Sequence, residues 1–205
     1  MGKEKHVTAC PMMNILINTG LINEENASDD DVRAAINKIS LVDKVVLHTF
    51  MNLALHLVKD SNLGNDIKRI NKHNLLEHDA SLTRLDAYFG NEIVLNKKRY
   101  NKLKDMSEDG KYLTVKNFSD HKNKMIIHSK KNNPEFVFGF SEVIKSLVES
   151  SLVYTCLRDQ TGNVPIERMD TFIKRARFPS AKGKLTINQI KWHSLLSIMF
   201  QLATN

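Results

Sequence analysis

The chain has 205 residues, of which 41% are hydrophobic and 26% charged, with four prolines and eight glycines. This composition is typical of a globular protein and excludes a disordered, collagen-like or disulfide-rich class. The formal net charge of +7 permits weak attraction to acidic surfaces. The lysines are scattered, however, and we expect the basic stretch 121–131 to be a solvated helix face, so we predict no nucleic-acid partner.

No apolar run reaches the roughly 18 residues of a membrane helix, and the start of the chain lacks the apolar core of a signal peptide. We therefore predict no membrane span, and either an intracellular protein or a mature form whose leader has been removed. The Asn-x-Ser sequons at Asn26 and Asn117 keep secretion open. With only Cys10 and Cys156 there is no disulfide framework, but a bridge between two chains through Cys156, if that residue is exposed, leaves a homodimer possible.

The first half of the chain carries three helix signals in succession. Cys10-Pro11 opens a segment that closes at Gly20, with proline at the first helical position. Ser28 followed by Asp31 predicts the start of a second helix. The mostly apolar run 41–58 is long enough for a central buried helix.

The second half is also helical in pattern. We predict helices from Val115 to about Ser129 and over 140–157, and a third that begins at Pro165. Thr186 and Gln189 form the pattern of a capping box for a last helix. With no period-two alternation, repeat or linker, residues 1–205 are predicted to form one all-α domain.

The stretch "HNLLEHDASLTR" at 73–84 places two carboxylates, an imidazole and a hydroxyl close together. On a helix, Glu77 and Ser81 would share a face and offer hard oxygen ligands to Mg²⁺, completed by waters and an anionic ligand. His78 would point elsewhere and be free for proton transfer. The alternative is an ordinary polar helix start in which Arg84 pairs with a carboxylate.

Cys10 lies immediately before a proline at a helix start. There the positive helix end and backbone N–H groups would favour the thiolate, suited to a nucleophile, a metal ligand or a haem axial ligand. The alternative is a small buried residue, which is also what we expect of Cys156 within its apolar helix.

Glu149 is followed by largely apolar residues. Burial among them would raise its pKa and let it exchange protons near neutrality. The alternative is a surface glutamate that contacts Lys145.

Together and in this order, these pieces resemble the haem-thiolate peroxidase family, the fungal chloroperoxidases and unspecific peroxygenases. "CPMMNILINTG" (10–20) is similar to the family's "CPALNTLANHG", and "HNLLEHDASLTRLDAYFG" (73–90) is similar to its "HN-IEHDASLSR-D-YFG". "NPEFVFGF" (133–140) resembles its Asn-Pro-x-Phe segment, at a spacing to Glu149 that fits the family's catalytic glutamate. The chain departs from the pattern at Ala9, where the family has proline, and at Val148, where it has glycine.

The resemblance implies a helical domain that encloses haem b, with Cys10 as the axial thiolate on iron. It implies that Glu77, Ser81 and the main-chain carbonyl of His78 hold Mg²⁺, or Mn²⁺, against a haem propionate. Glu149 would take a proton from hydrogen peroxide and return it to the leaving oxygen, and His78 would orient Glu149 by a hydrogen bond.

The activity implied is a peroxygenase that inserts oxygen from hydrogen peroxide into C–H or C=C bonds of small hydrophobic, aromatic or fatty-acid substrates, with peroxidase side activity. Two alternatives stay open: a haloperoxidase or one-electron peroxidase, and a haem-binding helical protein with impaired catalysis. Most members of the resembled family are secreted, unlike the expectation from the start of this chain.

Overall fold

The structure is a computed structural model that describes residues 5–39, 43, 49, 67–73, 77–181 and 184–205. The central helix predicted over 41–58 lies outside these residues, apart from two isolated positions. All structural statements below refer to the described part of the chain.

The described chain is mostly helical, which confirms the predicted fold class. The helices are α1 (Pro11–Asn18), α2 (Asp29–Lys38), α4 (Lys97–Lys104), α5 (Val115–Asn132), α6 (Phe140–Leu157), α7 (Ile166–Met169) and α8 (Trp192–Thr204), with short helical turns at Ile67–Asn71, Ala87–Phe89 and Asp170–Lys174. Strands β1 (Tyr112–Leu113) and β2 (Val164–Pro165) form one antiparallel pair, and β3 (Ser180–Ala181) and β4 (Lys184–Leu185) form another. The sequence had given no sign of either pair, because two-residue strands are too short to show alternation.

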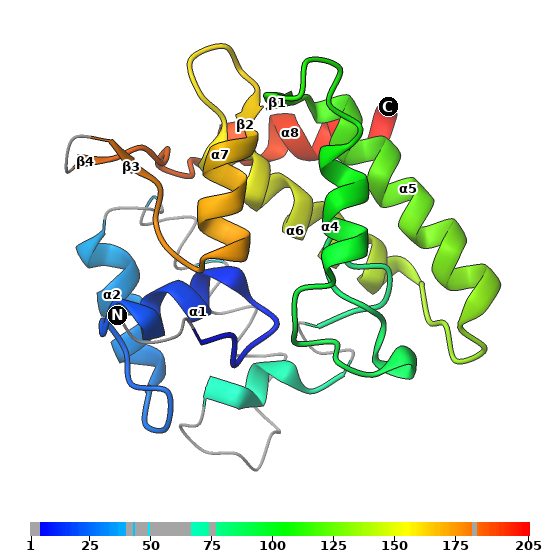
Figure 1. Ribbon diagram of the computed structural model, residues 1–205. Helices are drawn as coiled ribbons and strands as arrows, with labels where there is room; N and C mark the ends of the chain where they lie inside the picture. The colour runs from blue at the N-terminus through cyan, green and yellow to red at the C-terminus, as the bar shows by residue number, and fades with distance from the viewer. Residues whose placement is uncertain (1–4, 40–42, 44–48, 50–66, 74–76, 182–183) are drawn as a thin grey trace.

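Helix α6 runs through the middle of the molecule, with α4 and α5 to one side and α1 and α2 below it on the other (Figure 1). It packs most extensively on α8, and α5 packs on both. The larger hydrophobic core lies around α6 and includes Phe118, Tyr154 and Leu157, while a smaller core joins α1 to α2 through Leu16 and Val32. None of the helices in the described ranges is long and apolar enough to cross a membrane.

The predicted helix starts are confirmed where a local cap defines them. At the start of α2 the Asp31 N–H donates to Ser28 Oγ at 3.1 Å, and the Ser28 N–H donates to Asp31 Oδ2 at 2.9 Å. Helix α1 begins at Pro11 and is followed by Gly20, whose φ of 70° suits glycine. Helix α6 has the predicted bounds, and Cys156 is buried in it as expected.

The predicted capping box at Thr186 and Gln189 is wrong. Helix α8 begins only at Trp192, and the preceding segment is extended. The Thr186 N–H donates to the Pro179 carbonyl beside the β3–β4 pair, and the Asn188 N–H donates to the Cys156 carbonyl at the end of α6, both at 2.8 Å. These tertiary hydrogen bonds hold the backbone out of the helix that the local pattern favours.

Candidate active site

The stretch 77–86 is an irregular loop and not a helix, so Glu77 and Ser81 do not share a helix face. Two carboxylates of the loop accept hydrogen bonds from backbone N–H groups. The Ala80 N–H donates to Asp86 Oδ1 at 3.1 Å, and the Val137 N–H donates to Asp79 Oδ2 at 3.2 Å. Ala80 has a φ of 58°, in the left-handed region, which a continuous helix would not allow.

A buried ion pair anchors the end of this loop. Arg99 Nη2 of α4 lies 3.1 Å from Asp86 Oδ1, and Arg99 also donates to the Arg84 carbonyl. The Asn133 side-chain amide donates to both Asp79 and Asp86 at 3.3 Å. The loop is therefore fixed from α4 and from the end of α5.

The same loop presents three hydrogen-bond donors to Glu149 of α6. Ser81 Oγ donates to Oε1 at 2.8 Å, Arg84 Nη2 donates to Oε1 at 2.9 Å, and the Leu82 N–H donates to Oε2 at 3.2 Å. Residues that are far apart in the sequence thus meet, although Ser81 had been predicted as a metal ligand and not as a partner of Glu149. Oxygen Oε2 receives one protein hydrogen bond where Oε1 receives two.

The expected raised pKa of Glu149 is wrong. Burial acts to raise it, but the charges of Arg84 and His78 and the hydrogen bonds from Ser81 and Leu82 outweigh burial and hold the pKa below its usual range. The sequence reading had assumed apolar surroundings. The alternative, a surface Glu149 that contacts Lys145, is also wrong. Lys145 Nζ lies 3.2 Å from Glu142 Oε1.

His78 is buried and faces Glu149. Its Nδ1–H donates to the Asp79 carbonyl at 2.8 Å, since a carbonyl can only accept. Its Nε2 lies 3.7 Å from Glu149 Oε2, an ion-pair distance that is too long for the predicted hydrogen bond. This hydrogen bond is therefore not formed at the observed distance, and the role of His78 in orienting Glu149 stays a prediction.

Glu77 and Ser81 hold different partners. Glu77 is buried and accepts a hydrogen bond from His73 Nδ1 at 2.6 Å, whereas Ser81 binds Glu149. Burial raises the pKa of Glu77, and the nearby His73, His78 and Arg84 partly offset that rise. Within the described ranges no group of three or more His, Cys, Asp or Glu side chains is placed to hold a metal. Binding of Mg²⁺ or Mn²⁺ by Glu77, Ser81 and the main-chain carbonyl of His78 therefore stays a prediction.

Cys10 is the N-cap of α1, as predicted, and is half-buried. Burial raises the pKa of its thiol, while the backbone N–H groups of Met12 and Met13 and the charge of Arg84 act to lower it. The backbone N–H groups at the helix start thus favour the thiolate as predicted, but burial outweighs them and the pKa of the thiol is raised. The charges of Arg84 in the loop 77–86 and of Glu149 on α6 both act on Cys10, so the N-cap of α1 lies in the same region as these two residues.

Sequence reasoning missed the roles of Asp86 and Arg99, and placed Arg84 only as one half of a possible ion pair. Arg84 links the site together, because it contacts Glu149 while its charge influences both Cys10 and Glu77. The sequence did carry a signal for these roles. Charged residues that lie among many small and apolar neighbours must form ion pairs or hydrogen bonds if that stretch of chain is buried.

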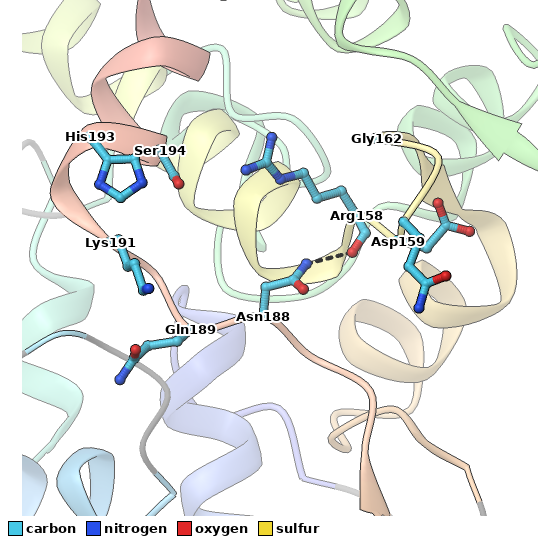
Figure 2. A pocket seen from close by; sticks show the side chains of 9 residues that line it. Arg158, Asp159, Gly162, Asn188, Gln189, Lys191, His193 and Ser194 are labelled. Atoms are coloured by element: carbon cyan, nitrogen blue, oxygen red, sulfur yellow. Dashed lines mark hydrogen bonds between the residues drawn. The ribbon is translucent and has the colours of Figure 1, made fainter.

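Neither of two pockets on the surface includes the predicted site residues. One, of about 640 Å³, lies where the end of α6 meets the start of α8. Figure 2 shows the Arg158 side chain between Ser194 and Asp159, with the Asn188 amide hydrogen-bonded to the Arg158 carbonyl. Apart from Gly162, the residues that line this pocket have polar or charged side chains. The other, between α4 and α5, is taken up below.

Comparison with known proteins bears on this site directly. The family model described as "Peroxidase, family 2" matches residues 2–194, which include Cys10, the loop 77–86 and Glu149. No curated protein matches the chain. Because the family match covers nearly the whole chain, the protein belongs to peroxidase family 2 and is an oxidoreductase that acts with hydrogen peroxide.

Proposed function

We propose that this protein is a haem-thiolate peroxygenase that uses hydrogen peroxide, with peroxidase side activity. The observation that carries the proposal is the family match together with the convergence of Cys10, Arg84 and Glu149 in one region. The proposed substrates are small hydrophobic, aromatic or fatty-acid molecules that accept oxygen at a C–H or C=C bond.

The residues present fit a haem. Cys10 is half-buried at a helix start, and its thiol is of the type that binds haem iron as an axial ligand. The Nε–H of Arg84 is buried and has no hydrogen-bond partner among the described residues, so it is a donor suited to a carboxylate of the cofactor. When bound through a thiolate, haem supplies the chemistry that favours O–O cleavage, and a bound metal ion deprotonates a coordinating thiol despite the raised pKa.

In this proposal Glu149 accepts and returns the proton. Its lowered pKa keeps the side chain a carboxylate at neutral pH, the form that can act as a base. Oxygen Oε2 carries the spare acceptor capacity, because Oε1 is occupied by Ser81 and Arg84. Arg84 and the Leu82 N–H hold the carboxylate in place during the exchange.

The first test is the spectrum of the haem-reconstituted, reduced protein under carbon monoxide. We expect a strongly red-shifted Soret band that disappears in Cys10→Ala, because cysteine thiolate and histidine give different bands. The matched control is Cys156→Ala, which removes the other, buried thiol and should keep the band. A band typical of histidine ligation, or one that survives in Cys10→Ala, would reject Cys10 as the axial ligand.

The second test is peroxide turnover by Glu149→Gln. Loss of the acid–base group should lower the rate of peroxide-driven oxidation of an aromatic substrate by about 10²–10⁴-fold. Glu142→Gln, on the same helix and paired with Lys145, should keep activity close to that of the parent at equal haem content. Equal rates for Glu149→Gln and the parent would reject the proposed role of Glu149.

A further inference from the structure

A second pocket, of about 710 Å³, lies between α4 and α5. Cys10 and Glu149 do not line it. Its walls come from the last turn of α4, the residues that follow it, and one face of α5 over positions 121–132. The site is thus distinct from the proposed haem site and has its own chemistry.

The rim of this pocket is cationic. Lys102, Lys124 and Lys131 line it and are exposed, and none of their side-chain ammonium groups forms an ion pair or hydrogen bond with another residue in the described ranges. Asp105 supplies the negative charge of the lining. Three lysines against one aspartate leave a positive field at the opening, which favours a ligand with a negative charge.

The wall below the rim is apolar. Met106, Met125 and Ile127 line the pocket; Met125 is buried, whereas Ile127 is 67% exposed although it is a large aliphatic residue. Methionine side chains are flexible and polarisable and adapt to flat or irregular apolar groups. An inorganic anion would use the lysines and leave this wall in contact with water, so the wall favours a ligand with an apolar body.

His121 lines the inner part of the pocket and is 1% exposed. Its Nε2–H donates to the Leu82 carbonyl at 2.8 Å. Burial lowers the pKa of His121 below its usual range, which favours the neutral ring. Nδ1 is then an acceptor, and it has no hydrogen-bond partner among the described residues.

We propose that the pocket between α4 and α5 binds a small amphipathic acid, with its anionic group among Lys102, Lys124 and Lys131 and its apolar ring or chain against Met106, Met125 and Ile127. The lysines bind the negative charge, and the apolar wall makes the pocket selective for such a molecule over a simple inorganic ion. The proposal does not depend on haem binding, because no predicted haem contact lines the pocket.

Calorimetric titration of the full chain with 2-naphthoate, beside the neutral isostere 2-naphthamide, tests the proposal. At low ionic strength we expect 2-naphthoate to bind at least about tenfold more tightly than the amide, and the difference to shrink as salt screens the rim. Equal affinities for acid and amide would overturn the proposed recognition of charge.

Paired variants locate the site. Lys124→Gln/Lys131→Gln should weaken 2-naphthoate binding by about tenfold, since each exposed lysine contributes modestly. Lys97→Gln/Lys130→Gln removes the same total charge from exposed positions on α4 and α5 outside the lining and should leave affinity unchanged. Ile127→Ser, at an exposed position, should weaken binding of both probes. Unchanged affinity in the first variant, or an equal loss in the control, would overturn the assignment to this pocket.

Discussion

Two carboxylate–arginine pairs each take one member from the loop 77–86, and they differ in how much of the carboxylate remains exposed. In the first pair the side chains of Asp86 and Arg99 are 0% and 6% exposed. In the second, Glu149 and Arg84 are 15% and 8% exposed. Both pairs have short nitrogen–oxygen distances, 3.1 Å and 2.9 Å, so distance alone does not separate them.

The exposure of the carboxylate separates them instead. Each carboxylate has one oxygen with a single hydrogen bond: Oδ2 of Asp86 accepts from the Asn133 amide at 3.3 Å, and Oε2 of Glu149 accepts from the Leu82 N–H at 3.2 Å. The Asp86 side chain is fully enclosed, whereas the Glu149 side chain is partly exposed. The difference fits a structural role for the first pair and the proposed proton transfer for the second. An arginine beside a carboxylate does not by itself distinguish a structural pair from a reactive one.

The largest expected effect on stability comes from Asp86→Ala. It leaves the Arg99 guanidinium buried without its carboxylate, which should lower the free energy of unfolding by about 3–5 kcal/mol. Chemical denaturation measures this directly. Replacing both members, Asp86→Leu with Arg99→Met, should recover much of the loss because no lone charge remains. If Asp86→Ala unfolds at the same denaturant concentration as the parent, the structural assignment of this pair is wrong.

A smaller and pH-dependent effect is expected from Glu149→Gln. At neutral pH it should lower the free energy of unfolding by about 1–3 kcal/mol, since hydrogen bonds to a charged acceptor are lost. The folded-state pKa of Glu149 lies below its unfolded value, so its contribution is fully present above an unfolded pKa of about 4.3.

That contribution should disappear as the pH falls through the lower folded-state pKa. The difference in stability between parent and Glu149→Gln, measured by denaturation from pH 7 to pH 3, should therefore be constant down to about 4.3 and then shrink. A difference that grows as the pH falls would contradict the lowered pKa.

The smallest effect is expected from an exposed ion pair, which calibrates the comparison. Lys116 and Asp120 of α5 are 2.8 Å apart, with side chains 66% and 33% exposed. Lys116→Gln should change the free energy of unfolding by about 0.5 kcal/mol or less, and less still in high salt. If its effect matched that of Asp86→Ala, burial would not be what distinguishes these pairs.

Local chemistry in the sequence predicted the starts of α1 and α2 and the bounds of α6, whereas α4 was not predicted. The cap at Ser28 and the proline at position 11 act within a few residues, so their consequences can be read along the chain. The β3–β4 segment could not be read in this way. There, backbone bonds to Pro179 and to Cys156 of α6 override a local capping pattern.

The site was predictable in its residue types but not in its geometry. Motif residues at Cys10, 77–81 and Glu149 were identified from the pattern, and the structure brings Ser81 and His78 to Glu149. The left-handed backbone at Ala80, and the polar surroundings that lower the pKa of Glu149, depend on partners supplied by Asp86 and Arg84. These partners come together only in the tertiary structure, so local sequence patterns do not predict them.

Leu82 joins two helices through its main chain. Its N–H donates to Glu149 of α6, and its carbonyl accepts from His121 of α5. Its side chain lies in the hydrophobic core, where another aliphatic residue of similar volume would serve. Natural variation at this position should therefore be tolerant of shape and intolerant of proline, which has no N–H to donate. The constraint on position 82 is one of backbone geometry, and a comparison of side-chain identities would pass over it.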